Sequence, residues 1–250
     1  MSPARRTALI AGVFFALTFV SSIAAVALYA PLLTDPRYVL GAGADTRIFA
    51  GAFCEIVLAI TNIGTAVVLY PIVRRQSEGV ALGYVASRIA ESVLIAVGIL
   101  SVLSVVTLRQ AFTAGAGADA AAYTVAARSL VALHDWTFLL GPGLLAGLGN
   151  GLLLGSLLYR SRLIPRGLSI IGVIGGPLVF VSGIAVLFGL HEQASVTSAV
   201  ATIPEFVWEA VLSVWLIVRG FRPDALERLE VRSRGEQAVA SPVAGPLAAR

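Results

Sequence analysis

The sequence predicts an all-α protein, a polytopic membrane bundle of six transmembrane helices with both termini in the cytoplasm. Of its 250 residues, 58% are hydrophobic and 13% are charged, whereas soluble domains are about half apolar and a quarter charged. The mean hydropathy is +0.90. Six apolar stretches reach the length of about 20 residues that a helix needs to cross a bilayer. Arginines gather in alternate connections between these stretches. Together these observations indicate a lipid-embedded helical protein.

The predicted spans follow one another within residues 1–222 and form one domain. They cover about residues 8–30, 48–73, 80–108, 136–159, 168–190 and 201–218. The first span has an alternative interpretation as a signal peptide, because Arg5 and Arg6 precede it and Ala25-Val26-Ala27 resembles a cleavage site. The apolar run is longer than a usual signal-peptide core, which favours a retained span.

Orientation follows from the arginines, because basic residues stay on the cytoplasmic side of a membrane. One set of connections and ends contains Arg5, Arg6, Arg74, Arg75, Arg160, Arg162, Arg166, Arg219 and Arg222. The opposite set contains only Arg37, Arg47, Arg109 and Arg128. Both termini are therefore expected in the cytoplasm. The basic residues are all arginine, which is typical of GC-rich bacterial genomes, so we expect a multi-pass protein of the bacterial inner (plasma) membrane, in contact with membrane lipids.

Two segments lie outside the predicted spans. In the connection from Arg109 to Leu133, Asp119 is placed to cap a short alanine-rich helix, Ala120–Leu133, lying at the outer surface. Residues 223–250 are expected to form a largely disordered cytoplasmic tail that begins as a fraying extension of the sixth span.

A weak internal repeat links the second and fourth spans. Residues 62–70 and 150–159 each begin with an asparagine, end with a tyrosine and precede arginines. A parallel repeat of helix hairpins is one interpretation, since some transporters contain repeats. The favoured interpretation is that tyrosine and arginine belong at any cytoplasmic interface.

Glycines mark a packing face on the fourth span. Gly143, Gly147, Gly151 and Gly155 recur every four residues, and Gly172 and Gly176 offer a matching surface on the fifth span. Small residues let helix backbones approach closely in lipid. This face suits internal packing better than a dimer contact, so a homo-oligomer is compatible with the sequence without being indicated by it. Gly141-Pro142-Gly143 is expected to kink the helix.

Charged residues inside the spans are the main functional signal, because an ionisable group at the bilayer centre costs about 2.5–3.5 kcal/mol on insertion scales. At about 1.5 Å per residue, Glu55 lies roughly 10 Å, Glu209 roughly 12 Å and Glu91 roughly 14 Å below the outer surface, with Arg88 one turn deeper. These four residues form one predicted layer, with Arg88 as the shared counter-ion. Glu205, His134 and Asp135 are predicted nearer the outer surface, with the last two at the mouth of the site.

Two interpretations of this layer remain open. A structural ion-pair network would tie the bundle together. An outward-facing site with more acids than arginines would suit a proton, a cation or an amine.

Other chemistries are poorly supported. Two histidines and the single Cys54 offer no metal site, and the sequence contains no cofactor fingerprint, so neither a metal nor a cofactor is expected. Nothing indicates binding to nucleic acid. The cytoplasmic arginines suit anionic lipid, although an orienting role explains them more simply.

Five stretches resemble an uncharacterised bacterial membrane family, domain of unknown function 4386. The stretches are LYPIVRR (69–75), ALGYVASRIAE (81–91), HDWTFLLGP (134–142), LLYRSRLIPR (157–166) and VWLIVRGF (214–221). The resemblance covers nearly the whole chain up to Phe221. It implies a multi-pass membrane protein and implies no activity or site residue.

Three functions are therefore considered. The first is binding or transport of a small molecule, cation or proton through the acidic layer. The second is a non-catalytic membrane scaffold or partner subunit in which the charges are structural. An intramembrane enzyme ranks last.

Overall fold

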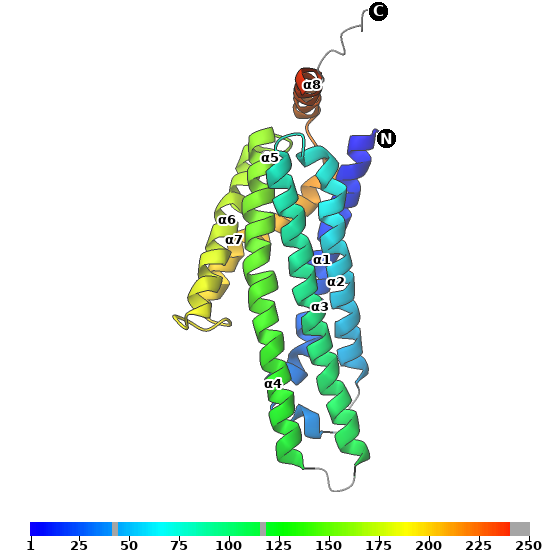
Figure 1. The fold of residues 1–250 in the computed structure, drawn as a ribbon, viewed down its shortest axis with the longest axis vertical. Coiled ribbons are helices and arrows are strands. Elements are labelled where there is room, and N and C mark those ends of the chain that lie inside the picture. Colours follow the sequence, from blue (N-terminus) through cyan, green and yellow to red (C-terminus); the bar gives the residue numbers. More distant parts are fainter. Residues whose placement is uncertain (42–44, 116–118, 241–250) are drawn as a thin grey trace, which may run out of the picture.

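The computed structural model describes residues 1–41, 45–115 and 119–240, with the backbone alone for residues 236–240. All regular structure in these residues is helical, and six helical segments are long and apolar enough to cross a membrane, which confirms the predicted fold class (Figure 1). The helices are α1 (Pro3–Thr34), η1 (Tyr38–Leu40), α2 (Thr46–Val73), α3 (Glu78–Ala114), α4 (Ala120–Phe138), η2 (Leu139–Leu145), η3 (Gly147–Leu154), α5 (Gly155–Ser161), α6 (Arg166–Leu187), α7 (Val196–Val218) and α8 (Pro223–Ala240).

The spans are arranged as a ring in chain order. Each span packs against the next, and α7 closes the ring by packing against α1. The N-terminus and α8 lie at the same end of the bundle, which we call the terminal end (Figure 1). We call the opposite end, where α3 finishes and α4 begins, the far end.

The fourth span is one continuous helical segment, Ala120–Ser161. The prediction of a separate surface helix over Ala120–Leu133 is therefore wrong. Asp119 does cap this helix by accepting from the backbone N–H of Ala121. The helix then runs directly into the bundle because it packs against α3, where the Ser101 hydroxyl donates to the Leu130 carbonyl at 2.5 Å.

The middle of the fourth span is π-helical, in η2 and η3. Pro142 has no N–H and cannot continue an α-helical ladder, and the Ala146 N–H bonds to the Gly141 carbonyl five residues back. π-helical turns inside α-helices are rare and frequent at functional sites.

The glycines of the fourth span pack inside the chain. A Cβ atom at Gly176 would lie 2.6 Å from the Leu152 nitrogen and 2.8 Å from the Gly151 Cα. A Cβ at Gly147 would lie 2.7 Å from the Gly176 carbonyl oxygen. The glycine face therefore forms the contact between the fourth span and α6, while Gly172 instead accommodates the Trp208 ring of α7.

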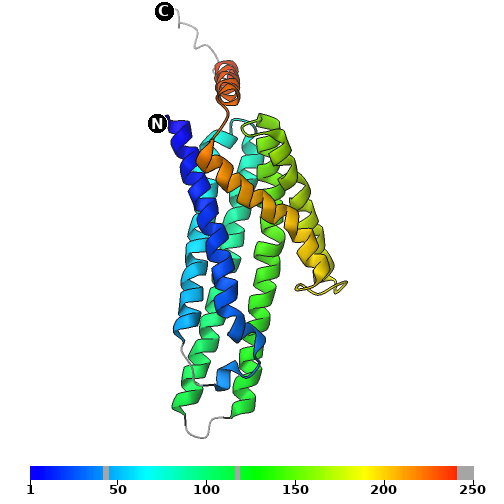
Figure 2. The ribbon, with the colours of Figure 1, turned by 180° about the vertical axis from the view of Figure 1, so that it is seen from behind.

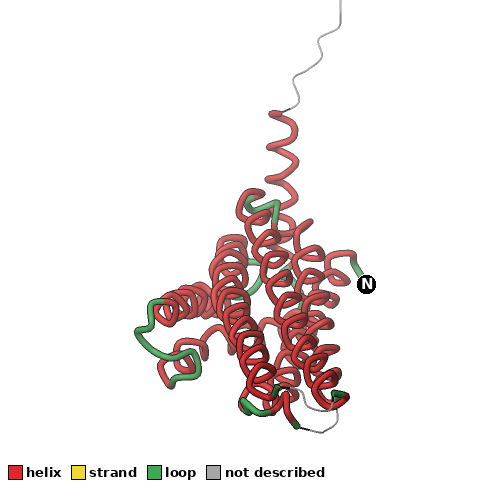
Figure 3. The backbone as a smooth tube through the Cα atoms, turned by 60° about the horizontal axis from the view of Figure 1, so that its bottom comes forward, coloured by secondary structure: helices red, strands yellow, loops and turns green. Residues whose placement is uncertain are grey.

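The α6–α7 hairpin is shorter than the rest of the bundle. α6 has 22 residues and α3 has 37, so at 1.5 Å per residue they measure about 33 and 55 Å. The hairpin leans away from the other helices, and its loop ends well short of the far end (Figures 1 and 3). The far end therefore consists of α1–α4 and η1 alone.

Two apolar clusters follow from this shape. The cluster at the terminal end includes residues from α1, α2, α3, the fourth span, α6, α7 and α8, with Trp208 and Tyr84 fully buried. The cluster at the far end includes Tyr29, Val102 and Ala127 and draws on α1, η1, α2, α3 and α4. On α3, the buried Arg88 and Glu91 lie between Tyr84 of the terminal-end cluster and Ile95 of the far-end cluster.

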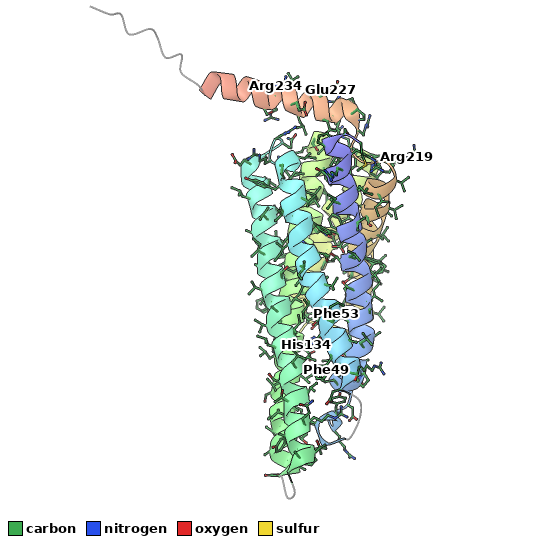
Figure 4. The ribbon with its side chains drawn as sticks, turned by 90° about the vertical axis from the view of Figure 1, so that its right-hand side faces the viewer. Phe49, Phe53, His134, Arg219, Glu227 and Arg234 are labelled. Carbon is green, nitrogen blue, oxygen red and sulfur yellow. The ribbon has the colours of Figure 1, made fainter. Side chains whose placement is uncertain are left out.

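The chain after α7 turns and starts a new helix instead of extending α7. Gly220 has a φ of 73°, which favours glycine, and the Arg222 N–H donates to the Leu163 carbonyl at 2.9 Å. α8 then crosses the terminal end (Figure 4), with Ala225 and Leu229 buried in the cluster there. The prediction of a fraying extension is wrong over residues 223–240, and the predicted disorder of residues 241–250 lies outside the described residues.

Candidate functional site: an acidic cavity between the α6–α7 hairpin and the bundle

A cavity of ≈ 430 Å³ lies where the α6–α7 hairpin leaves the bundle. Every span contributes to its wall. Five of the predicted site residues line it: Glu55, Arg88, Glu91, Glu205 and Glu209. These five residues come from α2, α3 and α7.

Arg88 and Glu91 form an ion pair on one face of α3. The Arg88 Nη1 lies 2.8 Å from Glu91 Oε2, and the two side chains are 1% and 5% exposed. The spacing i, i+3 places both groups on the same side of the helix. The Nε and Nη2 atoms of Arg88 are buried without a hydrogen-bond partner among the described residues.

Arg88 is not the shared counter-ion that the depths predicted. Among the described residues its ion pair is with Glu91. Glu205 and Glu209 lie within electrostatic range of Arg88, whereas the electrostatic neighbours of Glu55 are His134 and Tyr29. Depth along the membrane normal does not tell which way a side chain faces. Two residues at one depth on neighbouring helices therefore need not touch.

Glu209 is held by Asn150, whose side-chain amide donates to Glu209 Oε1. Asn150 is fully buried in η3, and Asn62 of α2 is equally buried and donates to Ser92 at 3.4 Å. Both asparagines begin the two halves of the weak sequence repeat. The repeat therefore marks two buried amides, one of which contacts a cavity carboxylate.

Glu205 is the least satisfied of the acids. It is 5% exposed, and neither carboxylate oxygen has a hydrogen-bond partner among the described residues. A Cβ at Gly175 would lie 2.6 Å from the Glu205 nitrogen, and Glu205 Oε2 lies directly against Gly151. These glycines let α7 approach closely, which buries Glu205 on the cavity wall.

Glu55 lines the opposite side of the cavity. It is 7% exposed, and its Oε2 atom has no hydrogen-bond partner among the described residues. Its electrostatic neighbour is His134. The His134 ring packs edge-on against Tyr29, with ring centroids 5.8 Å apart.

His134 and Asp135 do not lie at the mouth of this cavity, contrary to the prediction. His134 is buried inside the bundle, at the level of the exposed Phe49 and Phe53 of α2 (Figure 4). Asp135 lines a smaller cavity of ≈ 170 Å³. The reason is that α4 is a continuous helix, which turns successive side chains by about 100°, so His134 faces the bundle and Asp135 faces outward.

Two polar residues of α7, Ser198 and Thr202, were missed from the sequence. They line the cavity together with the predicted Glu205 and Glu209, and the spacing of these four residues, by four, three and four, is that of one helix face. Thr18 and Ser22 of α1 line it at the same i, i+4 spacing. A stripe of this kind in an apolar span is the signal that would have found them.

The donor set does not suit a bound metal. Among the residues described, no group of three or more His, Cys, Asp and Glu side chains converges closely enough to hold a metal ion. The cavity combines separated carboxylates, one guanidinium and several hydroxyls.

The sequence profile of a protein family matches residues 10–220 of the chain. The chain belongs to the family described as domain of unknown function (DUF4386). This confirms the resemblance, and the matched region includes all five charged residues of the cavity in this DUF4386 protein. Neither a curated protein nor a solved structure is significantly similar to the chain.

Proposed function

We propose that this multi-pass membrane protein binds, and as a transporter moves, a small organic cation in the acidic cavity. The observation that carries the proposal is Glu205, whose two carboxylate oxygens are buried and unpartnered on a cavity wall. A buried charged group without a partner is strongly destabilising. A protonated amine would give Glu205 the positively charged partner and the N–H donors that the described residues do not supply.

The charge balance supports the same ligand class. Four carboxylates, from Glu55, Glu91, Glu205 and Glu209, face a single guanidinium around one cavity. Arg88 already pairs with Glu91. A cation entering the cavity would reduce the repulsion among the remaining acids.

A scaffold with a structural network is the alternative, and the Arg88–Glu91 pair is the observation that favours it. The pair is buried within one helix, and Ser92 donates to the Arg88 carbonyl at 2.9 Å. It does not account for Glu205 or Glu55, because neither has an ion-pair partner among the described side chains.

The arginine distribution supports an inner-membrane protein whose cavity faces outward. The arginines of the terminal end include Arg74 and Arg166, which lie over the Tyr70 and Tyr159 rings at 5.7 and 5.0 Å, as interfacial anchors do. The terminal end is then cytoplasmic, and the α6–α7 loop beside the cavity is external. Surrounding lipids are the other expected partner.

The test is calorimetric titration of the protein in nanodiscs with propylammonium, propionamide and propionate. We expect only propylammonium to bind. Glu205→Gln and Glu209→Gln should each weaken it by about tenfold or more, since truncating a buried charge pair costs about 2–5 kcal/mol. Glu192→Gln is the matched control, because Glu192 is exposed and outside the cavity wall.

Stability without ligand separates the two functions. Glu205→Gln should leave the unliganded protein as stable as wild type or more stable, by about 1–3 kcal/mol, because an unsatisfied buried charge is removed. A structural network predicts the opposite, a loss of stability with no amine binding in wild type. Equal binding of the amide and the amine would also contradict the proposal.

A further inference from the structure

The cavity wall is only partly charged. Apart from the five charged residues, the hydroxyls and Gln193 in the α6–α7 loop, its lining is largely apolar. The apolar part includes Ile23 and Val26 of α1, Phe138 of α4 and Val186 of α6. A small hydrophilic cation makes no use of such a wall, whereas a hydrocarbon chain packs against it.

These apolar residues border an opening between α1 and the hairpin. α1 and α7 remain in contact as far as Phe19 and Phe206, whose ring centroids are 4.4 Å apart. Beyond that pair the two helices diverge (Figure 2). The far-end cluster contains no α6 or α7 residue among its buried members. We call the region bounded by Ile23, Val26, Phe138 and Val186 the lateral slot.

The lateral slot faces the surroundings of the bundle. Ile23 and Val26 are 50% and 54% exposed, although both also line the cavity. The slot lies along the length of α6 and α7, which at about 33 Å match the apolar thickness of a bilayer. A chain leaving the cavity through it would therefore enter lipid.

We propose that the ligand is an amphiphile, with an ammonium head at Glu205 and Glu209 and a hydrocarbon chain in the lateral slot. This inference rests on the proposed function and adds the substrate class to it. Glu205 is buried, whereas Ile23 and Val26 are half-exposed, so the head lies inside and the chain points outward. A long-chain amine and an aminophospholipid share this chemistry.

The experiment fills the slot without changing the charged residues. Val26→Trp and Ile23→Trp place a bulky ring at the opening, and Val20→Trp places the same ring on α1 outside the cavity wall, where Val20 is 64% exposed. Binding of propylammonium, dodecylammonium and lysophosphatidylethanolamine is measured in phosphatidylcholine nanodiscs. Because all variants share one lipid content, partitioning into lipid cancels between them.

The expected result is selective. Val26→Trp or Ile23→Trp should lower the affinity for dodecylammonium or for lysophosphatidylethanolamine by about tenfold or more, or about 1.4 kcal/mol, because the ring takes the space of the chain. The affinity for propylammonium should stay within about twofold of wild type. If only one of the two amphiphiles loses affinity, that result shows whether the ligand is a long-chain amine or an aminophospholipid.

Three outcomes overturn the inference. If both slot variants bind the amphiphiles as Val20→Trp does, the chain does not occupy the slot. If the slot variants lose affinity for propylammonium as much as for the amphiphiles, the slot is the entrance for the head and does not hold the chain. Both results leave the proposed function intact. If wild type binds no amine at all, the proposed function fails and the inference fails with it. Unchanged melting temperatures of the variants exclude misfolding.

Discussion

The Arg88 side chain is buried in the bundle, and its guanidinium is only partly paired. Its side chain is 1% exposed, yet among the described residues only its Nη1 atom has a partner, Glu91. Polar groups buried in this way are expensive in lipid and are retained where they have a structural or functional role. The pair holds the charge in place, and the unpaired nitrogens face a region rich in acids.

Removing Arg88 should therefore destabilise the fold. We expect Arg88→Ala to lower the free energy of unfolding by roughly 3–5 kcal/mol, the range for breaking a buried pair. Glu91→Gln should have a smaller effect, because Glu205 and Glu209 remain within electrostatic range of Arg88. Denaturant unfolding in mixed micelles measures both. Arg128→Ala, on the exposed face of α4, is the control, and equal stability of the two alanine variants would contradict the assignment.

At the scale of elements, the contact between the fourth span and α6 positions the site. α6 approaches the fourth span so closely that Gly176 lies against the backbone at Gly151 and Leu152. This approach brings Gly151 against Glu205 and places Asn150 beside Glu209. The glycine face thus determines where two of the cavity acids lie.

Substitution of one glycine should disturb this contact. Gly176→Ala should lower stability by about 1–3 kcal/mol, because its Cβ has no space beside backbone atoms that cannot yield. Gly167→Ala, also on α6, is the matched control, since nothing lies within 4 Å of its Cβ position and alanine favours helix by about 1 kcal/mol. Unfolding curves compare them, and an equally tolerated Gly176→Ala would show that the two helices do not touch there.

At the scale of the whole molecule, the even number of spans places the N-terminus and α8 at one end. We expect that end to be cytoplasmic, from the arginines. Single cysteines at Ser77 and Gln193, in a Cys54→Ala background, are treated with an impermeant thiol reagent on intact cells. Position 193 should react and position 77 should react only after lysis. Labelling of position 77 in intact cells would invert the orientation and the direction of the cavity.

The tail divides into a packed part and a dispensable part. Truncation after Arg234 should leave the melting temperature nearly unchanged, because residues 235–250 are rich in Ala, Gly and Pro and contain few large apolar side chains. Truncation after Phe221 should lower it by several degrees, because it removes Ala225 and Leu229 from the terminal-end cluster and the Arg75–Glu230 ion pair at 3.2 Å. Equal melting temperatures for the two truncations would show that α8 does not stabilise the bundle.

The sequence by itself determined that six apolar segments are long enough to cross a membrane and that charged residues lie inside them. Hydropathy, length and arginine placement are properties of each segment alone, so they need no knowledge of neighbouring helices. For the same reason the sequence misjudged the places where contacts decide, including the start of the fourth span, the separate helix α8 and the position of His134.

Only the tertiary structure decided which charged residues meet. The estimated depth of Glu55 resembles that of Glu91, but Glu55 lies beside Tyr29 and His134 whereas Arg88 pairs with Glu91, and close packing at Gly151 and Gly175 brings Glu205 to the cavity wall. Tilt and register between helices depend on how small and large side chains of different spans fit together. The lean of the α6–α7 hairpin, and with it the cavity, arises from that fit and has no counterpart in the pattern of any single span.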